Sequence, residues 1–113
     1  AMNSVDIFTI SSSWPLSRIE QWKSLLIARA IENQTAIIAS NRIGSDDIAE
    51  WGGKSLIVSH QGNILSEASK HKKEIISHNI KIEDISKWKK EFPVLDDIKR
   101  DLLGNVRVEN IIP

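Results

Sequence analysis

The stretch LLIARAIENQTAIIASNRIG, from Leu25 to Gly44, decides the fold of this 113-residue chain. It predicts a helix that runs into a buried strand, because apolar residues at helical spacing give way to the short apolar run Thr35–Ser40. Polar residues crowd at the end of the helix, and an Asn-Arg pair closes the strand. These residues are either ordinary caps or the scaffold of a site whose chemistry lies elsewhere.

The helix is predicted to run from Ser17 to Asn33. Ser17 and Glu20 have the spacing of a capping box, in which the serine hydroxyl accepts the backbone N–H three residues on. Asn33 suits the left-handed residue that often ends a helix. The apolar stripe that would face a sheet consists of Ile19, Trp22, Leu26 and Ala30.

The polar end of this helix holds Arg29, Glu32 and Asn33, which are predicted to act as capping and ion-pair residues. Glu32 lies at the end where the helix dipole disfavours an acid. We therefore expect Glu32 to have a specific cationic partner, such as an arginine.

Four further segments have strand patterns, and Gly44–Gly53 reads as a polar loop between glycines. His60-Gln61-Gly62 predicts a hairpin with Gly62 at a positive φ. A second helix is expected from Glu83 to Glu91, ended by Pro93, with one more helical turn near 97–102. The predicted strands are residues 5–10, 54–59, 63–69 and 74–82.

This order predicts an α+β fold: one mixed sheet with two main helices on one face. Residues 3–100 would form the domain, and residues 101–113 an extended C-terminal tail. Such a sheet leaves its second face uncovered. Apolar strand residues would supply that face; they are Ile7, Ile37, Leu56, Val58, Ile64 and Ile75.

Composition excludes several classes of function. The 15 basic and 15 acidic residues balance, which gives no general attraction to nucleic acid or an anionic membrane. The sequence has no cysteine, and hence no disulfide or thiol nucleophile. It shows no membrane-spanning run and no signal-peptide pattern, so we expect a cytoplasmic location. Ala1-Met2 has the form of a cloning remnant before an initiator methionine, and Ala1 is left out of the predicted fold.

The histidines His60, His71 and His78 lack the close spacing of a zinc site, and the glycines lack the pattern of a phosphate loop. No metal or cofactor is therefore expected. A Ser-His-acid set can be assembled on paper from the SSS stretch at residues 11–13 and any of these histidines, but with many serines such a match arises by chance. The tryptophans are predicted to be core or interface anchors, because Trp22 and Trp88 lie on apolar stripes.

Three motifs resemble the carbon–nitrogen hydrolase (nitrilase) superfamily. They are SSSWP followed by ARAIENQ and NRIG, then GGKSLIVSHQGNILSEAS, then FPVLDD at Phe92–Asp97. Together they cover nearly the whole chain from Val5 to about Arg100. The likeness is strongest to the amidase branch that includes ω-amidase-like enzymes.

The resemblance implies half of a four-layer α-β-β-α sandwich and a Glu-Lys-Cys catalytic set. In the family, the cysteine attacks an amide or nitrile carbon, the glutamate acts as general base, and the lysine stabilises the developing charge. All three residues would precede the start of this sequence, with the cysteine just upstream of the first strand. No catalytic residue is carried over to this chain.

The resemblance also gives the stretch Leu25–Gly44 a scaffold role. It places Trp14, Asn41 and Arg42 near the mouth of the site, where they could line the substrate pocket. Two departures stand out: Ser59-His60 where the family usually has Asp-Pro, and Ile98-Lys99 where paired arginines are common.

The first interpretation is therefore the C-terminal half of an amidase-type hydrolase, either a truncated gene product or an engineered fragment, and inactive alone. The alternative is a non-enzymatic oligomerising or partner-binding fragment. A third is an independent hydrolase that uses serine and histidine. We expect a homodimer through the uncovered sheet face or the 17–33 helix, and binding to a missing N-terminal half. We expect neither nucleic acid nor membrane as a partner.

Overall fold

The structure is a computed structural model that describes residues 5–104. Its helices are α1 (Ile19–Asn33) and α2 (Ile82–Glu91), with 3-10 turns η1 (Leu16–Arg18), η2 (Val94–Asp97) and η3 (Arg100–Leu103). Its strands are β1 (Ile7–Ser12), β2 (Ala36–Asn41), β3 (Ile43–Ser45), β4 (Glu50–Gly52), β5 (Leu56–Val58) and β6 (Ile64–Glu67).

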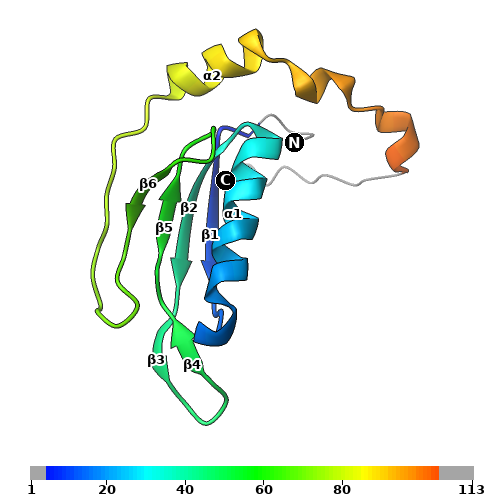
Figure 1. Ribbon diagram of the computed structural model, residues 1–113. Helices are drawn as coiled ribbons and strands as arrows, with labels where there is room; N and C mark the ends of the chain where they lie inside the picture. Colours follow the sequence, from blue (N-terminus) through cyan, green and yellow to red (C-terminus); the bar gives the residue numbers. More distant parts are fainter. Residues whose placement is uncertain (1–4, 105–113) are drawn as a thin grey trace, which may run out of the picture.

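A mixed four-stranded sheet has the order β1-β2-β5-β6, and β3 and β4 form a separate two-stranded ribbon. β1 and β2 are parallel and are joined through α1, whereas β2, β5 and β6 pair antiparallel. Figure 1 shows the sheet with α1 along one face and the β3–β4 ribbon extending beyond it. The predicted α+β fold is confirmed.

The core lies between α1 and the sheet. All four residues of the predicted stripe are buried, and Trp22 is only 2% exposed. Burial of a side chain of this size contributes a few kcal/mol to folding. The strand residues that meet the stripe are Ile37, Ala39, Leu56 and Val58, with Phe8 and Ile10 packed at the margin.

Both predicted caps of α1 differ from the structure. The capping box does not form: the η1 turn follows Pro15, and α1 begins one residue after Arg18 with no side-chain cap. At the other end Gln34, not Asn33, adopts the left-handed conformation. Glu32 has the expected arginine partner, which is Arg29 one turn earlier. Asn33 also caps the helix, donating from Nδ2 to the Arg29 carbonyl at 2.9 Å.

Two of the predicted segments are wrong. Residues 44–53 are not an irregular loop, since they hold most of the β3–β4 ribbon. Residues 74–82 do not form a strand, and Ile75 is 97% exposed. Their alternating pattern fits a strand, but a strand needs a neighbour to pair with, and this segment has none among the described residues. The predicted 54–69 hairpin is confirmed as β5–β6, with Gly62 at φ +86°.

The second helix, α2, lies at the end of the sheet rather than beside α1 on its face, as Figure 1 shows. Its Ile85 is fully buried. Lys89 donates to the Asp6 carboxylate at 2.8 Å, and Gln34 Nε2 donates to the Phe92 carbonyl at 2.7 Å. These two contacts attach the C-terminal part of the chain to the start of β1 and the end of α1. Within residues 5–104, no helix combines the length and apolar character required to span a bilayer.

The predicted composition of the uncovered sheet face needs correction. Ile37, Leu56 and Val58 belong to the core under α1 and are fully buried. Side chains alternate between faces along a strand, so the uncovered face belongs to their neighbours. It carries Ile38, which is 40% exposed, and its cross-strand partner Ile57, which is only 5% exposed. One face of the sheet is therefore the packed core under α1, and the other is exposed at Ile38 and buried at Ile57.

Two glycines with positive φ provide a matched test of how the β5–β6 hairpin packs on α1. A Cβ at Gly62 would lie 2.7 Å from Ile31 Cδ1, whereas a Cβ at Gly44 would meet nothing within 4 Å. We expect Gly44→Ala to lower the free energy of unfolding by about 1 kcal/mol, from the backbone alone. Gly62→Ala should lower it by clearly more. Urea denaturation measures both, and equal losses would contradict the packing.

Candidate functional site

The two parallel strands bring the sequence-predicted site residues to one edge of the sheet. Trp14 follows the carboxyl end of β1, and Asn41 and Arg42 stand at the carboxyl end of β2. In open sheets with parallel strands, ligands bind beyond the carboxyl ends. This edge, which we call the carboxyl edge, is therefore the candidate site.

Asn41 is a buried connector and not an exposed pocket residue. Its Oδ1 accepts the Trp14 backbone N–H at 2.7 Å and the Ser12 hydroxyl at 3.3 Å. Its Nδ2 donates to the Gly53 carbonyl at 2.9 Å and the Trp14 carbonyl at 3.3 Å. The side chain is thus fully satisfied by the protein itself, and the residue is only 9% exposed. Its role is to hold three segments together at the carboxyl edge.

Trp14 is held through its backbone. Besides the Asn41 contacts, its carbonyl accepts the Gly52 N–H at 2.9 Å, and the next residue, Pro15, forms an isolated bridge with Trp51. The backbone of Trp14 is therefore fixed, and its side chain is partly buried against the core.

Arg42 contacts the β3–β4 ribbon. Its Nη1 lies 2.8 Å from Asp46 Oδ2, and its guanidinium lies 4.8 Å from the centre of the Trp51 ring. Asp46 Oδ2 also accepts the Trp51 Nε1–H at 3.1 Å. These contacts form one cluster, Arg42–Asp46–Trp51, that runs along the ribbon from its start to its turn. Arg42 is half-exposed, so it retains a surface toward solvent.

Asp46 also builds the turn between β3 and β4. Its Oδ1 accepts the backbone N–H groups of Ile48 and Ala49 at 2.9 and 3.1 Å. These two hydrogen bonds, followed by those of Trp51 and the charge of Arg42, hold the pKa of Asp46 below its ordinary value. The ionised Asp46 carboxylate stabilises the ribbon fully at pH values above the pKa that Asp46 has in the unfolded chain. This stabilisation is lost as the pH falls through the lowered pKa of the folded state.

Sequence reasoning missed Asp46 and Trp51, because it read their segment as a loop. A short-range signal was present: an aspartate can turn the chain by accepting N–H groups two and three residues on.

Beside the Arg42–Asp46–Trp51 cluster lies a shallow, polar depression of about 330 Å³, lined by Gly44, Ser45, Glu50, Trp51 and His71. Within residues 5–104, no group of three histidine or acidic side chains could hold a metal ion.

The other two histidines lie away from the carboxyl edge. His60 and His78 line a small cavity of about 180 Å³ together with Asp84. Burial lowers the pKa of His60, and its ring lies 6.5 Å from that of Trp88. The hydroxyl of Ser59 accepts the N–H groups of Gln61 and Asn63, as in a turn. In the SSS stretch, Ser12 donates its hydroxyl to the Ser40 carbonyl at 2.8 Å. The serine–histidine alternative stays a prediction.

Asn41 and Arg42 provide a matched pair of adjacent residues for a test. Replacing Asn41 by Ala leaves the partly buried N–H of Trp14 and the buried Gly53 carbonyl without their partner, which should lower the free energy of unfolding by roughly 3 kcal/mol. Arg42→Ala removes a half-exposed ion pair and a ring contact and should lower it by about 1 kcal/mol or less. Denaturant titration of both variants measures this, and equal losses would argue against the connector role.

The comparisons with known proteins agree on one family. The sequence profile of the carbon–nitrogen hydrolase family matches residues 1–90. The 2-oxoglutaramate amidase of Bacillus subtilis is 41% identical over 97 residues, which are 86% of this chain and 37% of that protein. The omega-amidase YafV of Escherichia coli is 32% identical over 97 residues, which are 85% of this chain and 38% of that protein.

Solved structures give the same result. XC1258 from Xanthomonas campestris, a CN-hydrolase superfamily protein, matches with a TM-score of 0.74 at 27% identity, over 93% of this chain and 37% of that one. The predicted fold, part of a nitrilase-type sandwich, is confirmed. The chain spans less than two fifths of the length of these relatives. It belongs to the carbon–nitrogen hydrolase family.

Proposed function

We propose that this chain is the C-terminal part of an amidase of the ω-amidase type, and that it provides the scaffold of the carboxyl edge. The observation that carries the proposal is its 41% identity to a 2-oxoglutaramate amidase over 86% of the chain. The substrate of the whole enzyme would then be a small acid with a terminal amide. The reaction would be hydrolysis of its C–N bond.

The chemistry of that reaction would come from residues outside this sequence. The family resemblance implies a Glu-Lys-Cys set, and the chain has no cysteine. This chain would contribute the residues of the carboxyl edge, which would lie beside that catalytic set. Asn41 fixes the backbone of Trp14, and the Arg42–Asp46–Trp51 cluster fixes the ribbon. The half-exposed Arg42 would face the substrate.

The purified chain should therefore not hydrolyse 2-oxoglutaramate above the buffer rate, because loss of a nucleophile removes most of the rate enhancement. Co-expression with the part of the Bacillus subtilis amidase that this chain does not cover should give a complex that releases ammonia from the substrate. A cysteine-to-serine variant of that part is the control. Turnover by the chain alone, abolished by mutating one of its own residues, would overturn the proposal.

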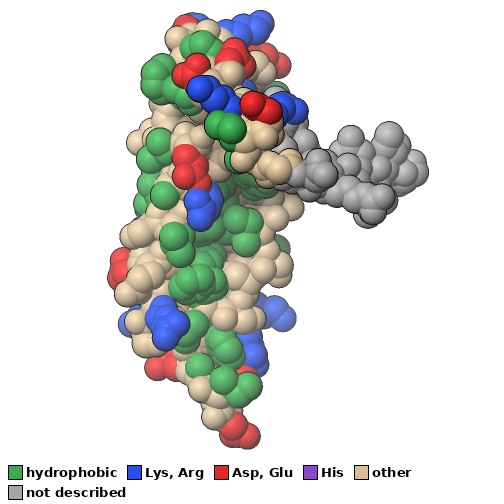
Figure 2. Space-filling view, turned by 90° about the vertical axis from the view of Figure 1, so that its right-hand side faces the viewer, with side chains coloured by type: hydrophobic (Ala, Val, Ile, Leu, Met, Phe, Trp, Pro, Cys, Tyr) green, Lys and Arg blue, Asp and Glu red, His purple; other side chains and the backbone are tan. Residues whose placement is uncertain are grey.

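The alternative is an oligomerising fragment, and exposed apolar residues on α1 favour it. Leu25 and Ile31 are 46% and 52% exposed, and Figure 2 shows apolar side chains in a band along this side of the molecule. Exposed apolar patches commonly mark interfaces, and two-fold pairs are the commonest oligomers. We propose that, without the rest of the enzyme, two copies of the chain associate through α1 or through the open sheet face.

Two charged variants identify the surface. Leu25→Lys should dissociate a dimer made through α1, and Ile38→Lys should dissociate a dimer made through the open sheet face. Ile37 is unsuitable, because it is buried under α1 and its replacement by lysine would unfold the chain. Light scattering at micromolar concentration measures the mass. A wild-type monomer would contradict both arrangements. The cytoplasmic location stays a prediction.

A further inference from the structure

α2 depends on the rest of the chain for its stability. Isolated helices shorter than about 12 residues are marginal in water, and α2 has 10 residues. The segment that leads into it, residues 68–81, holds no helix or strand. The later part of α2 is attached through Lys89, which donates to the Asp6 carboxylate, and the Phe92 carbonyl just beyond it accepts the Gln34 side chain. Contacts on the side that faces the β5–β6 turn therefore influence whether the helix stays in place.

The ring of His60 makes a contact on that side. His60 belongs to the turn between β5 and β6, and Figure 1 shows α2 beyond the end of the sheet at which this turn lies. The centre of the His60 ring lies 6.5 Å from the centre of the Trp88 ring, with 57° between the ring planes. The half-buried Trp88 ring in turn lies 5.8 Å from that of Phe92. Trp88 thus connects the turn to the residue that ends α2.

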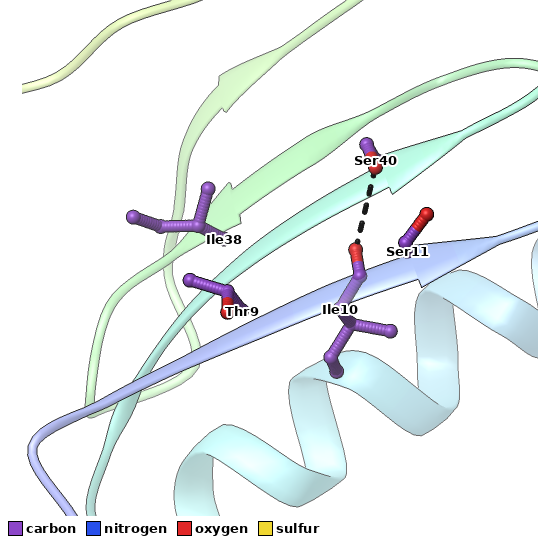
Figure 3. Close-up of a pocket in the computed structure, with 5 residues that line it drawn as sticks. All are labelled: Thr9, Ile10, Ser11, Ile38 and Ser40. Carbon is purple, nitrogen blue, oxygen red and sulfur yellow. Dashed lines mark hydrogen bonds between the residues drawn. The ribbon is translucent and has the colours of Figure 1, made fainter. Parts of the chain in front are cut away.

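A small cavity lies between the turn and α2. Its volume is about 180 Å³, and its lining includes Leu65 of β6, Asp84 of α2 and the two residues His78 and Lys81 of the segment before α2, together with His60. It differs from the depression on the open sheet face, shown in Figure 3, whose lining residues carry no titratable side chain. The β5–β6 turn, the segment before α2 and α2 itself therefore meet around a titratable ring.

The charges that face His60 come from both of the elements beside it. On α2, Asp84 favours the protonated ring and Lys89 disfavours it. On the segment before α2, Lys81 brings a positive charge to the same cavity, and His78 adds another when it is protonated. The β5–β6 turn contains no further titratable side chain. Burial outweighs the attraction of Asp84 and lowers the pKa of His60, so the folded chain favours the neutral ring.

The contact with Trp88 does not reverse this preference. A cation is attracted to the face of a tryptophan when it lies within about 6 Å of the ring centre. The His60 ring is tilted and its centre is 6.5 Å away, so a protonated ring would gain little of that attraction. It would still lose water on the side that α2 covers. Protonation therefore weakens the contact between the turn and the helix.

We propose that His60 is a pH-sensitive attachment point for α2: its neutral ring holds the helix against the β5–β6 turn, and protonation of the ring loosens the helix. Histidine suits this role because it is the side chain whose charge ordinarily changes between about pH 5 and 8. The sequence also departs from the family pattern here, since the family usually has a proline at this position. The attachment is thus a property of this chain, and it does not depend on the proposed amidase function.

The pH range follows from the direction of the shift. Above the ordinary pKa of histidine, 6.5, the His60 ring is neutral whether α2 is attached or open, and the attachment is at full strength. Below that pH the open state takes up the proton first, which favours opening. The contribution is lost as the pH falls through the lowered pKa of the folded state. α2 should therefore be loosened progressively as the pH falls below 6.5.

Amide hydrogen exchange of the wild-type chain tests the attachment. The readout is the protection factor, which corrects for the intrinsic pH dependence of exchange, at the Phe92 amide, whose N–H donates to the Trp88 carbonyl at 2.9 Å. Between about pH 7.5 and pH 5.5 we expect this factor to fall by about threefold or more. The protection factors of Leu26 and Ala30 in α1 should stay within about twofold. An unchanged factor at Phe92 would overturn the proposal.

Variants separate His60 from the other groups at the cavity. His60→Phe keeps a ring beside Trp88 that cannot be protonated, so α2 protection should no longer depend on pH in this range. His60→Gln removes the titration without a ring and serves as the second variant if phenylalanine disturbs the fold. His78→Gln is the matched control, because His78 is exposed and lines the same cavity, and it should keep the wild-type pH dependence. Asp84→Asn removes the charge that favours protonation and should move the midpoint to lower pH.

Nuclear magnetic resonance relates the loosening to His60 itself. The ring protons of His60 and the indole N–H of Trp88 should titrate with one midpoint, at a pKa below 6.5. If His60 titrates and the protection of α2 does not follow it, the proposal is wrong. A pH dependence that persists in both His60→Phe and His60→Gln also contradicts it and assigns the loosening to another group. Neither result bears on the amidase proposal, which the co-expression experiment tests separately.

Discussion

The side chain of Asn41 makes the hydrogen bonds on which the carboxyl edge depends. An asparagine side chain has one acceptor and one donor group, and here both are used twice, by Ser12, Trp14 and Gly53. A buried amide of this kind is strongly destabilising when its partners are absent and specifies one arrangement when they are present. The end of β1, the end of β2 and the start of the segment into β5 are thereby held in register. These contacts also fix the position of the β3–β4 ribbon, because the Gly53 N–H, just after β4, donates to the carbonyl of Arg42, just before β3.

A second polar residue connects the two ends of the described chain. Gln34 ends α1 in a left-handed conformation, is only 1% exposed, and reaches the carbonyl that follows α2. The polar crowding at the end of ARAIENQ therefore has a structural explanation residue by residue. Arg29 and Glu32 pair along the helix, Asn33 donates to the Arg29 carbonyl, and Gln34 links the helix to the C-terminal part. The contacts support the interpretation of Arg29, Glu32 and Asn33 as capping and ion-pair residues. The scaffold interpretation of this segment stays a prediction.

Much of the fold could be predicted from local pattern, and the errors share one cause. The stripe with Trp22 and Leu26, the buried strand β2 and the hairpin at Gly62 follow from periodicity and turn chemistry, which are properties of the sequence itself. Two predictions were wrong: the strand at 74–82 and the assignment of Ile37 to the uncovered face of the sheet. The first depends on whether another strand is available for pairing, and the second on which face of the sheet α1 covers. Periodicity gives two faces but does not say which one a helix covers.

Trp14, Asn41 and Arg42 lie together at the carboxyl edge. That they line a substrate pocket stays a prediction. Their roles could not be read from the sequence, because the partners of Asn41 lie 12 and 27 residues away along the chain. The sequence did not predict the contacts of Arg42 with Asp46 and Trp51. The segment that holds these two residues has no apolar periodicity, so it was predicted to be a loop. Side-chain hydrogen bonds, and not burial, determine its fold.

β1 is an outer strand of the sheet and carries no charged residue, so its free edge is unprotected. This matters while the polypeptide is being synthesised. Chains leave the ribosome from the N-terminus, and domains fold as they emerge. If the chain is the C-terminal part of a longer enzyme, as proposed, the preceding part is already made when β1 appears and is available to cover it. A chain made without that preceding part exposes IFTISS to every other nascent copy. Its yield in the cell would then depend on how fast it is made and on which chaperones meet it, more than on the stability of its core.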